Sequence, residues 1–316
     1  MAQFKPKSLA LSLRKHWHKS NRNSQFAYVL IAKARESCYK SDFELNIKGN
    51  VYAFDSSTID LCLSVFWWAE FRKTKAGIKL HTLYDVKTSI PTFIHITNAK
   101  THDVSALDEL VYEIGGFYIL DRAYVDYERL YLLNKQQAYF ITRAKSNMKF
   151  ARMYSNAVNK TKGVKYDQIG KLTSYYPKQI YPEKLRRIKY YDTDTNRTFI
   201  FLTNNMDLKA EEIAYLYKKR WEVELFFKWM KQHLKIKSFW GTSINAVKIQ
   251  IYCAIIAYCL VAIVGNTLKV ERSIYEILQI LSISLLDKSP VREILSKCDY
   301  KNLKELNSKQ LKINGF

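Results

Sequence analysis

The chain has 316 residues, 48% of them hydrophobic, which is enough for one large domain or two moderate ones with a substantial core. Lys and Arg number 51 against 29 Asp and Glu, and the net charge of +22 favours nucleic acid over a membrane surface, because the cations are spread along the chain rather than gathered on one helix. Five cysteines without a CxxC pair indicate neither a zinc site nor disulfides, and nine glycines form no phosphate-binding loop, so no nucleotide cofactor is expected.

Residues 1–48 are basic, and apolar positions recur at helical spacing in residues 26–40. This segment is expected to be helical and either to touch DNA or to pack against the rest of the protein. No continuous apolar stretch opens the chain, so we expect no secretory signal and a cytoplasmic, nucleoid-associated protein.

From Val51 the apolar pattern changes to short runs rich in β-branched and aromatic residues, which predict the start of an antiparallel sheet. The predicted strands are residues 51–55, 61–66, 78–86, 92–97, 117–121 and 138–142. Two helices are predicted between them, residues 103–116 with Asp103 as a possible N-cap and residues 126–137 with Asp126 as N-cap.

Residues 145–205 return to a strand-and-turn pattern and contain a predicted hairpin at 188–205. Long helices are predicted again from about Lys209. The apolar run Ile251–Gly265 would rise only about 22 Å as a helix, short of the roughly 30 Å of a bilayer core. It therefore predicts a buried helix, and no membrane span is expected.

One predicted helix holds four polar residues at spacings that place them on a single stripe: Tyr217, Arg220, Glu224 and Lys231. A carboxylate beside cations suits metal-dependent phosphoryl transfer, because the acid holds a divalent cation while the cations bind phosphate. A solvated helix face is the alternative interpretation. Glu222 lies on another side of the same helix.

Two further acids, Asp55 and Asp121, each close a predicted buried strand. Acids at the ends of neighbouring strands, together with Glu224 from a helix packed on that sheet, are able to converge on divalent ions. Either aspartate alone would more often be a turn former or a helix cap. The indication lies in the combination of all three.

The motifs FDSST around Asp55, LDRAY around Asp121 and Tyr217-x2-Arg220-x3-Glu224-x6-Lys231 resemble those of bacterial insertion-sequence transposases of the DDE type, in the branch with the Tyr-Arg-Glu-Lys signature. The resemblance extends from about residue 48 to about residue 265. It implies an α/β fold with a ribonuclease-H-like core, a mixed sheet flanked by helices, interrupted by a β-rich insertion and extended by helical N- and C-terminal segments.

The resemblance also implies the domain boundaries and the chemistry. Residues 1–48 are expected to be a basic helical N-terminal segment left from a truncated end-binding domain. Residues 49–144 are expected to form the first part of the core, 145–205 the insertion, and 206–265 the second part of the core with the Glu224 helix. Residues 266–316 are expected to be a helical C-terminal segment. Asp55, Asp121 and Glu224 are expected to ligate two Mg²⁺ ions, with Mn²⁺ as a substitute, for DNA cleavage and strand transfer without a covalent protein intermediate.

The expected partners are double-stranded DNA with terminal inverted repeats, target DNA and a second copy of the chain in a synaptic homodimer. Phosphate contacts are expected from Tyr217, Arg220, Lys231, Lys228, Lys235, Arg186 and Arg187. For the basic residues outside the signature, a solvated surface is an equal alternative. Trp221, Leu225 and Trp229 are expected to dock their helix on the sheet, with base stacking as the alternative.

Relatives of this type generally carry a longer N-terminal helical domain, and only 54 residues precede Asp55. Two other functions therefore stay open beside an active transposase. One is an N-terminally truncated DNA-binding remnant or regulator that occupies transposon ends without cutting. The other is a host nuclease with the same core fold.

Overall fold

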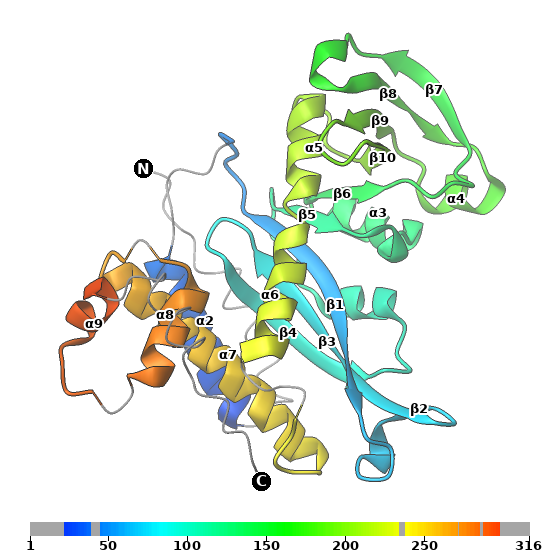
Figure 1. Cartoon of the computed structure of the whole chain (residues 1–316). Helices are drawn as coiled ribbons and strands as arrows, with labels where there is room; N and C mark the ends of the chain where they lie inside the picture. The colour runs from blue at the N-terminus through cyan, green and yellow to red at the C-terminus, as the bar shows by residue number, and fades with distance from the viewer. Residues whose placement is uncertain (1–21, 39–44, 234–237, 271, 285–286, 298–316) are drawn as a thin grey trace.

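The computed structural model describes residues 22–38, 45–233, 238–270, 272–284 and 287–297 (Figure 1). The strands are β1 (Val51–Leu61), β2 (Glu70–Arg72), β3 (Lys75–Asp85), β4 (Ile90–Asn98), β5 (Phe117–Leu120), β6 (Tyr139–Arg143), β7 (Phe150–Ser155), β8 (Val164–Leu172), β9 (Leu185–Asp192) and β10 (Arg197–Thr203). The α-helices are α2 (Arg22–Ser37), α3 (Tyr127–Lys135), α4 (Tyr175–Ile180), α5 (Ala210–Lys218), α6 (Trp221–His233), α7 (Ile244–Thr267), α8 (Ile274–Ile283) and α9 (Val291–Lys297). Short 3-10 helices are η1 (Trp67–Ala69), η2 (Asp103–Glu109), η3 (Arg122–Tyr124) and η4 (Lys160–Lys162).

All ten strands belong to one mixed sheet. β1 pairs antiparallel with β3, which also pairs antiparallel with β4, and this confirms the predicted antiparallel start. On its other side β1 pairs in parallel with β5, and β5 pairs in parallel with β6. Helices α5 and α6 pack on this sheet, and the mixed α/β architecture predicted from the sequence is confirmed.

The strands of residues 145–205 extend the central sheet rather than forming a separate one. β10 pairs antiparallel with β6, and β9, β8 and β7 follow in that order. Adding β10 to the edge of β6 satisfies backbone groups that an edge strand would leave open. The predicted hairpin is confirmed as β9 and β10.

Three local predictions were wrong. β1 does not end at Asp55 but continues to Leu61, because β3 pairs with it over that whole length. Residues 62–66 form a turn and not a strand. The helix predicted from Asp103 is only the 3-10 helix η2, and its N-cap residue is His102 rather than Asp103. In contrast, Asp126 caps α3 as predicted, accepting a hydrogen bond from the backbone N–H of Arg129 at 3.1 Å.

The long helix predicted from residue 209 is divided by a turn at residues 219–220 into α5 and α6. The buried face of α6 is formed by Val223, Phe226, Phe227 and Met230. Trp221 and Leu225 are 58% and 52% exposed, so the prediction that they dock the helix was wrong. Spacing alone did not separate two adjacent apolar stripes on one helix.

Helix α7 is longer than the apolar run that predicted it. Among the described residues it is the one helix whose length and composition would suffice to cross a membrane. Ile251, Ile255 and Cys259 are nevertheless fully buried, and α7 packs along α2 (Figure 1). These contacts are those of a helix in the core of a folded domain.

A buried ion pair attaches α2 to the sheet. Arg35, 3% exposed, donates from Nε and Nη2 to Asp85 at 3.0 and 2.7 Å and from Nη2 to the hydroxyl of Tyr52 at 3.1 Å. Burial opposes its charged form, but Tyr52 and Asp85 outweigh burial and raise the pKa of Arg35. Arg35 therefore keeps its charge inside the protein.

We predict that Arg35→Met lowers the free energy of unfolding by about 3–5 kcal/mol, because it leaves Asp85 buried without its counter-charge. Arg129→Met is the matched control, since Arg129 pairs with the half-exposed Asp108 and its loss should cost less than about 1 kcal/mol. Urea denaturation measures both. Equal losses for the two variants would contradict this account of α2.

His81 predicts a pH dependence of stability. It is fully buried, and burial lowers its pKa to about 4. The unfolded chain binds the proton more readily than the folded one. The contribution of His81 to the free energy of unfolding is therefore fully present above its ordinary pKa of about 6.5 and is lost as the pH falls toward 4. We expect a loss of roughly 2 kcal/mol between about pH 7 and pH 5, measured by urea denaturation. This component should disappear in His81→Gln, and an unchanged pH dependence in that variant would exclude His81 as its source.

Candidate active site

The pairing of β1 and β5 brings two of the predicted acids to the same edge of the sheet. Phe54 and Leu120 are the last partners in this parallel pair, and Asp55 and Asp121 are the next residue in each strand direction. Beyond this point β1 continues with β3 alone, so the Asp55 carboxylate lies where the sheet opens. Parallel register thus places side by side two aspartates that are 66 residues apart.

The turn between α5 and α6 brings the third acid to Asp55. Arg220 donates from Nη1 to Asp55 Oδ2 at 2.8 Å and from Nη2 to Glu224 Oε1 at 2.6 Å. Its side chain is 12% exposed, whereas those of Asp55 and Glu224 are 18% and 33% exposed. One guanidinium therefore bridges two of the three acids at the protein surface.

Asp121 is held by a separate set of donors. Arg143 Nη2 lies 2.8 Å from Asp121 Oδ1, and the hydroxyl of Tyr217 donates to the same oxygen at 3.3 Å. Arg143 is a residue of the site that the sequence motifs did not predict. The feature that could have identified Arg143 is its position at the end of β6. Asp121 and Arg143 both lie two residues beyond the paired Ile119 and Ile141, so they end neighbouring strands at the same level.

The carboxylates differ in their electrostatic surroundings. Burial raises the pKa of Asp55 to about 6, and the like charges of Glu224 and Asp121 add to this effect, while the Ser56 N–H and Arg220 oppose it. For Asp121 burial also acts upward, but the Arg122 N–H and Arg143 outweigh it and lower the pKa. The acids are close enough to repel one another and are kept together by arginine.

The three carboxylates are hard oxygen ligands of the kind that divalent cations such as Mg²⁺ prefer. As placed, no group of three His, Cys, Asp or Glu side chains within the described ranges could hold a metal ion. Arg220 lies between Asp55 and Glu224, and Arg143 holds Asp121. The three carboxylates are the kind of ligand that a divalent cation binds, and in this structure arginine side chains are bonded to their oxygens.

Residues that follow Asp55 in β1 make hydrogen bonds to Asp55 and to the elements around it. The Ser56 N–H donates to Asp55 Oδ1 at 2.8 Å, and Ser56 Oγ donates to Asp103 at 2.7 Å. Asp103 also pairs with Lys79 at 3.1 Å. Lys231 Nζ donates to the backbone carbonyl of Thr58 at 2.7 Å and ties α6 to β1. The four signature residues thus face β1 and β5, although they lie on two helices and the turn between them.

The remaining predicted DNA contacts are distributed unevenly. Lys228 is exposed on α6. Arg187 is partly exposed, with its guanidinium 4.6 Å from the centre of the Phe150 ring. Arg186 is 3% exposed and binds the buried Asp167 at 2.7 and 2.9 Å, so its selection as a DNA contact was wrong. Lys235 lies outside the described residues.

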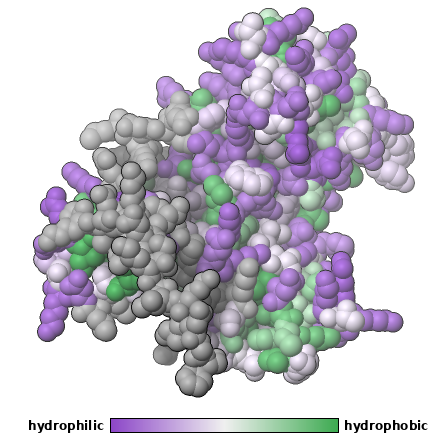
Figure 2. Space-filling model, viewed as in Figure 1, coloured by the Kyte–Doolittle hydropathy of each residue, from purple (hydrophilic) through white to green (hydrophobic). Residues whose placement is uncertain are grey.

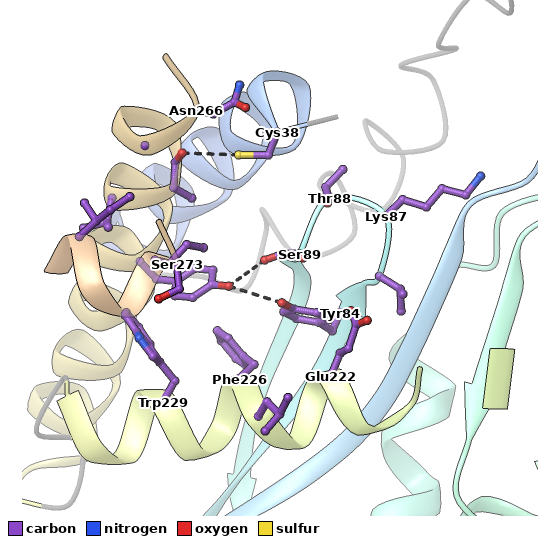
Figure 3. A pocket seen from close by; sticks show the side chains of 18 of the residues that line it. Cys38, Tyr84, Lys87, Thr88, Ser89, Glu222, Phe226, Trp229, Asn266 and Ser273 are labelled. Atoms are coloured by element: carbon purple, nitrogen blue, oxygen red, sulfur yellow. Dashed lines mark hydrogen bonds between the residues drawn. The ribbon is translucent and has the colours of Figure 1, made fainter. Parts of the chain in front are cut away.

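The cavity drawn in Figure 3 is not part of this acid site. It has a volume of about 950 Å³ and lies between α6, α7, α8 and the β3–β4 turn. Glu222, Phe226 and Trp229 line it from α6, and Glu222 pairs with Lys219 at 3.4 Å. Glu222 is therefore separate from the acid site, as its spacing predicted. The carboxylates themselves are partly exposed, which leaves them open to a long polymeric substrate.

Comparison with known proteins places this geometry in a family. Residues 47–260, more than half of the chain, match the family described as "Transposase DDE domain". A protein named as transposase y4zB from Sinorhizobium fredii is 32% identical over 231 residues, covering 72% of this chain and 64% of its own length. A protein named as a transposase for insertion sequence element IS5377 from Geobacillus stearothermophilus is 33% identical over 65% of this chain and 54% of its own length.

A third relative, named as a transposase for insertion sequence element IS4SA from Synechocystis, is 28% identical over 66% of this chain and 58% of its own length. The matched region thus spans between 54% and 64% of these curated relatives. The family match covers all three acids and the turn that joins α5 to α6. The chain belongs to the DDE transposase domain family, whose members have a ribonuclease-H-like fold and depend on a divalent metal.

Proposed function

We propose that this chain is a transposase that cleaves DNA and transfers strands at the ends of an insertion sequence. The observation that carries the proposal is that Arg220 bridges Asp55 and Glu224, while Asp121, which follows the neighbouring strand β5, is held by Arg143 and Tyr217. The names of the relatives support the same activity. The proposed reaction is an in-line displacement at a phosphodiester, without a covalent protein intermediate.

In this proposal Asp55, Asp121 and Glu224 hold two Mg²⁺ ions, or Mn²⁺ in their place. Bound metal supplies activation of the attacking water or 3′-hydroxyl and stabilisation of the leaving oxygen. The protein's own contribution is to fix the acids. β1 and β5 set the spacing of the two aspartates, and the α5–α6 turn sets the position of Glu224 against Asp55.

The substrate in this proposal is double-stranded DNA with terminal inverted repeats, together with target DNA. Tyr217, Arg220 and Lys231 hold phosphates beside the acids, and Lys228 and Arg187 add contacts farther out. Hydrophilic residues cover most of the visible surface over β7 to β10, consistent with a polar ligand on this side (Figure 2). Two copies of the chain act together in a synaptic homodimer.

The proposed organisation follows the expected segments. Residues 49–144 and 206–265 form the catalytic core, 145–205 the β-rich insertion, 1–48 a basic segment at the DNA ends, and 266–316 the C-terminal segment. Residues 1–21, 39–44, 234–237, 271, 285–286 and 298–316 of these segments lie outside the described residues. The proposed location is the bacterial cytoplasm, at the nucleoid. A DNA-binding remnant that does not cut is the alternative outcome of the tests below.

We expect Asp55→Asn, Asp121→Asn and Glu224→Gln each to reduce DNA cleavage by on the order of a thousandfold or more, because each removes a charged metal ligand. The assay follows nicking and strand joining in Mg²⁺ or Mn²⁺ on DNA that carries the element's own ends. Chelation of the metal should abolish both reactions.

Glu222→Gln is the matched control, since it makes the same change on the same helix but its side chain lines the separate cavity. It should retain cleavage at nearly the original rate. Binding of the DNA ends without any cleavage by the unaltered protein would favour the remnant, and cutting without any need for repeat ends would favour a nuclease.

Salt dependence distinguishes surface cations from the buried one. A plot of log K for DNA binding against log salt has a negative slope. We predict that Lys228→Gln makes this slope shallower by about 0.9, because one phosphate contact is lost. Arg186→Gln should leave that slope unchanged but destabilise the fold by about 3–5 kcal/mol, since it leaves the buried Asp167 without its ion-pair partner. Fluorescence anisotropy with a labelled duplex and urea denaturation measure the two effects. Unchanged slope in Lys228→Gln would remove this lysine from the interface.

A further inference from the structure

Arg220 has an unusual position for a residue that is expected to bind DNA. Two of its guanidinium nitrogens already donate to Asp55 and Glu224, at 2.8 and 2.6 Å. The backbone carbonyl of Tyr217 accepts from the Arg220 N–H, so the residue is also fixed by the turn between α5 and α6. Its side chain is only 12% exposed. In this state the guanidinium faces the acids.

The bridge engages oxygens that a metal would need. Asp55 Oδ2 and Glu224 Oε1 each accept a charge-assisted hydrogen bond from Arg220. A cation placed between these two oxygens would meet the guanidinium at the same point and would repel it. Arg220 neutralises the pair of carboxylates in the way that a bound cation would.

We propose that Arg220 couples metal binding to DNA binding by exchanging the two carboxylates for a DNA phosphate. This inference rests on the proposed function. Without DNA, Arg220 bridges Asp55 and Glu224 and weakens their affinity for a divalent cation. When a backbone phosphate accepts the guanidinium, the two carboxylates are released for the metal.

The chemistry of the surrounding residues fits this exchange. A guanidinium binds carboxylate and phosphate with the same two-pronged geometry, so a phosphate is able to replace a carboxylate as its partner. Lys228 and Lys231, on the same helix as Glu224, would attract the DNA backbone to this place. By linkage, if DNA raises the affinity for metal, metal raises the affinity for DNA by the same factor.

The test measures Mn²⁺ affinity of the full chain from the electron paramagnetic resonance signal of free Mn²⁺, with and without a short DNA duplex, subtracting Mn²⁺ bound by DNA alone. For the unaltered protein we expect DNA to tighten Mn²⁺ binding by on the order of tenfold, the worth of one charge-assisted hydrogen-bonded contact. Arg220→Gln should bind Mn²⁺ more tightly without DNA, and DNA should then add little.

Two further variants separate the bridge from charge alone. Lys219→Gln removes the same charge one residue earlier, where Lys219 pairs with Glu222, and should keep the tightening by DNA. Arg220→Lys keeps the charge but not the two-pronged bridge, and its DNA-free affinity should move toward that of Arg220→Gln. Circular dichroism checks that each variant is folded.

The outcomes separate this inference from the proposed function. If Asp55→Asn abolishes Mn²⁺ binding but Arg220→Gln binds Mn²⁺ like the unaltered protein, with the same tightening by DNA, the coupling is wrong and the metal site stands. If Asp55→Asn leaves Mn²⁺ binding unchanged, the metal site itself is wrong. If DNA tightens Mn²⁺ binding equally in Lys219→Gln and in Arg220→Gln, the role of the bridge is also overturned.

Discussion

Repulsion between carboxylates at one edge of the sheet is the constraint on which the site depends. Asp55 and Glu224 are brought together from β1 and α6, and burial raises the pKa of Asp55 to about 6. Arg220 offsets that repulsion with one guanidinium, and Arg143 does the same for Asp121. A protein that holds these acids together must therefore supply cations of its own or bind them from solution.

The sheet supplies the rigid part of this arrangement. β1, β5 and β6 are parallel neighbours, so Asp55, which follows the last β1 residue paired with β5, lies beside Asp121 and Arg143 at the ends of β5 and β6. The helices supply Glu224, on α6, and its counter-charge Arg220, in the short turn that joins α5 to α6. A guanidinium placed in such a turn is able to change partners with little change in the sheet below it. In the coupling proposed above, the acids keep their places while their counter-charge changes, which suits a family that depends on divalent metal.

Most strands and helices of the core were predictable from the sequence, since β3, β5 and α3 follow strong local patterns of apolar residues and turn or cap signals. The end of β1 was not predictable, because pairing with β3 extends it past Asp55 through polar residues. The division between α5 and α6 was also missed. No glycine or proline marks the turn at residues 219–220, so tertiary packing and not local propensity decides it.

The sequence by itself determined the identity and order of the acid motifs, the signature that includes Tyr217 and Lys231, and the mixed α/β class, because these depend on residue type and local spacing. Only the tertiary structure decided which cation meets which acid. Arg143 pairs with Asp121 through the register of two parallel strands, and Arg186 is buried against Asp167 rather than offered to DNA. Contacts between segments far apart in the chain follow from register and packing, which local patterns do not specify.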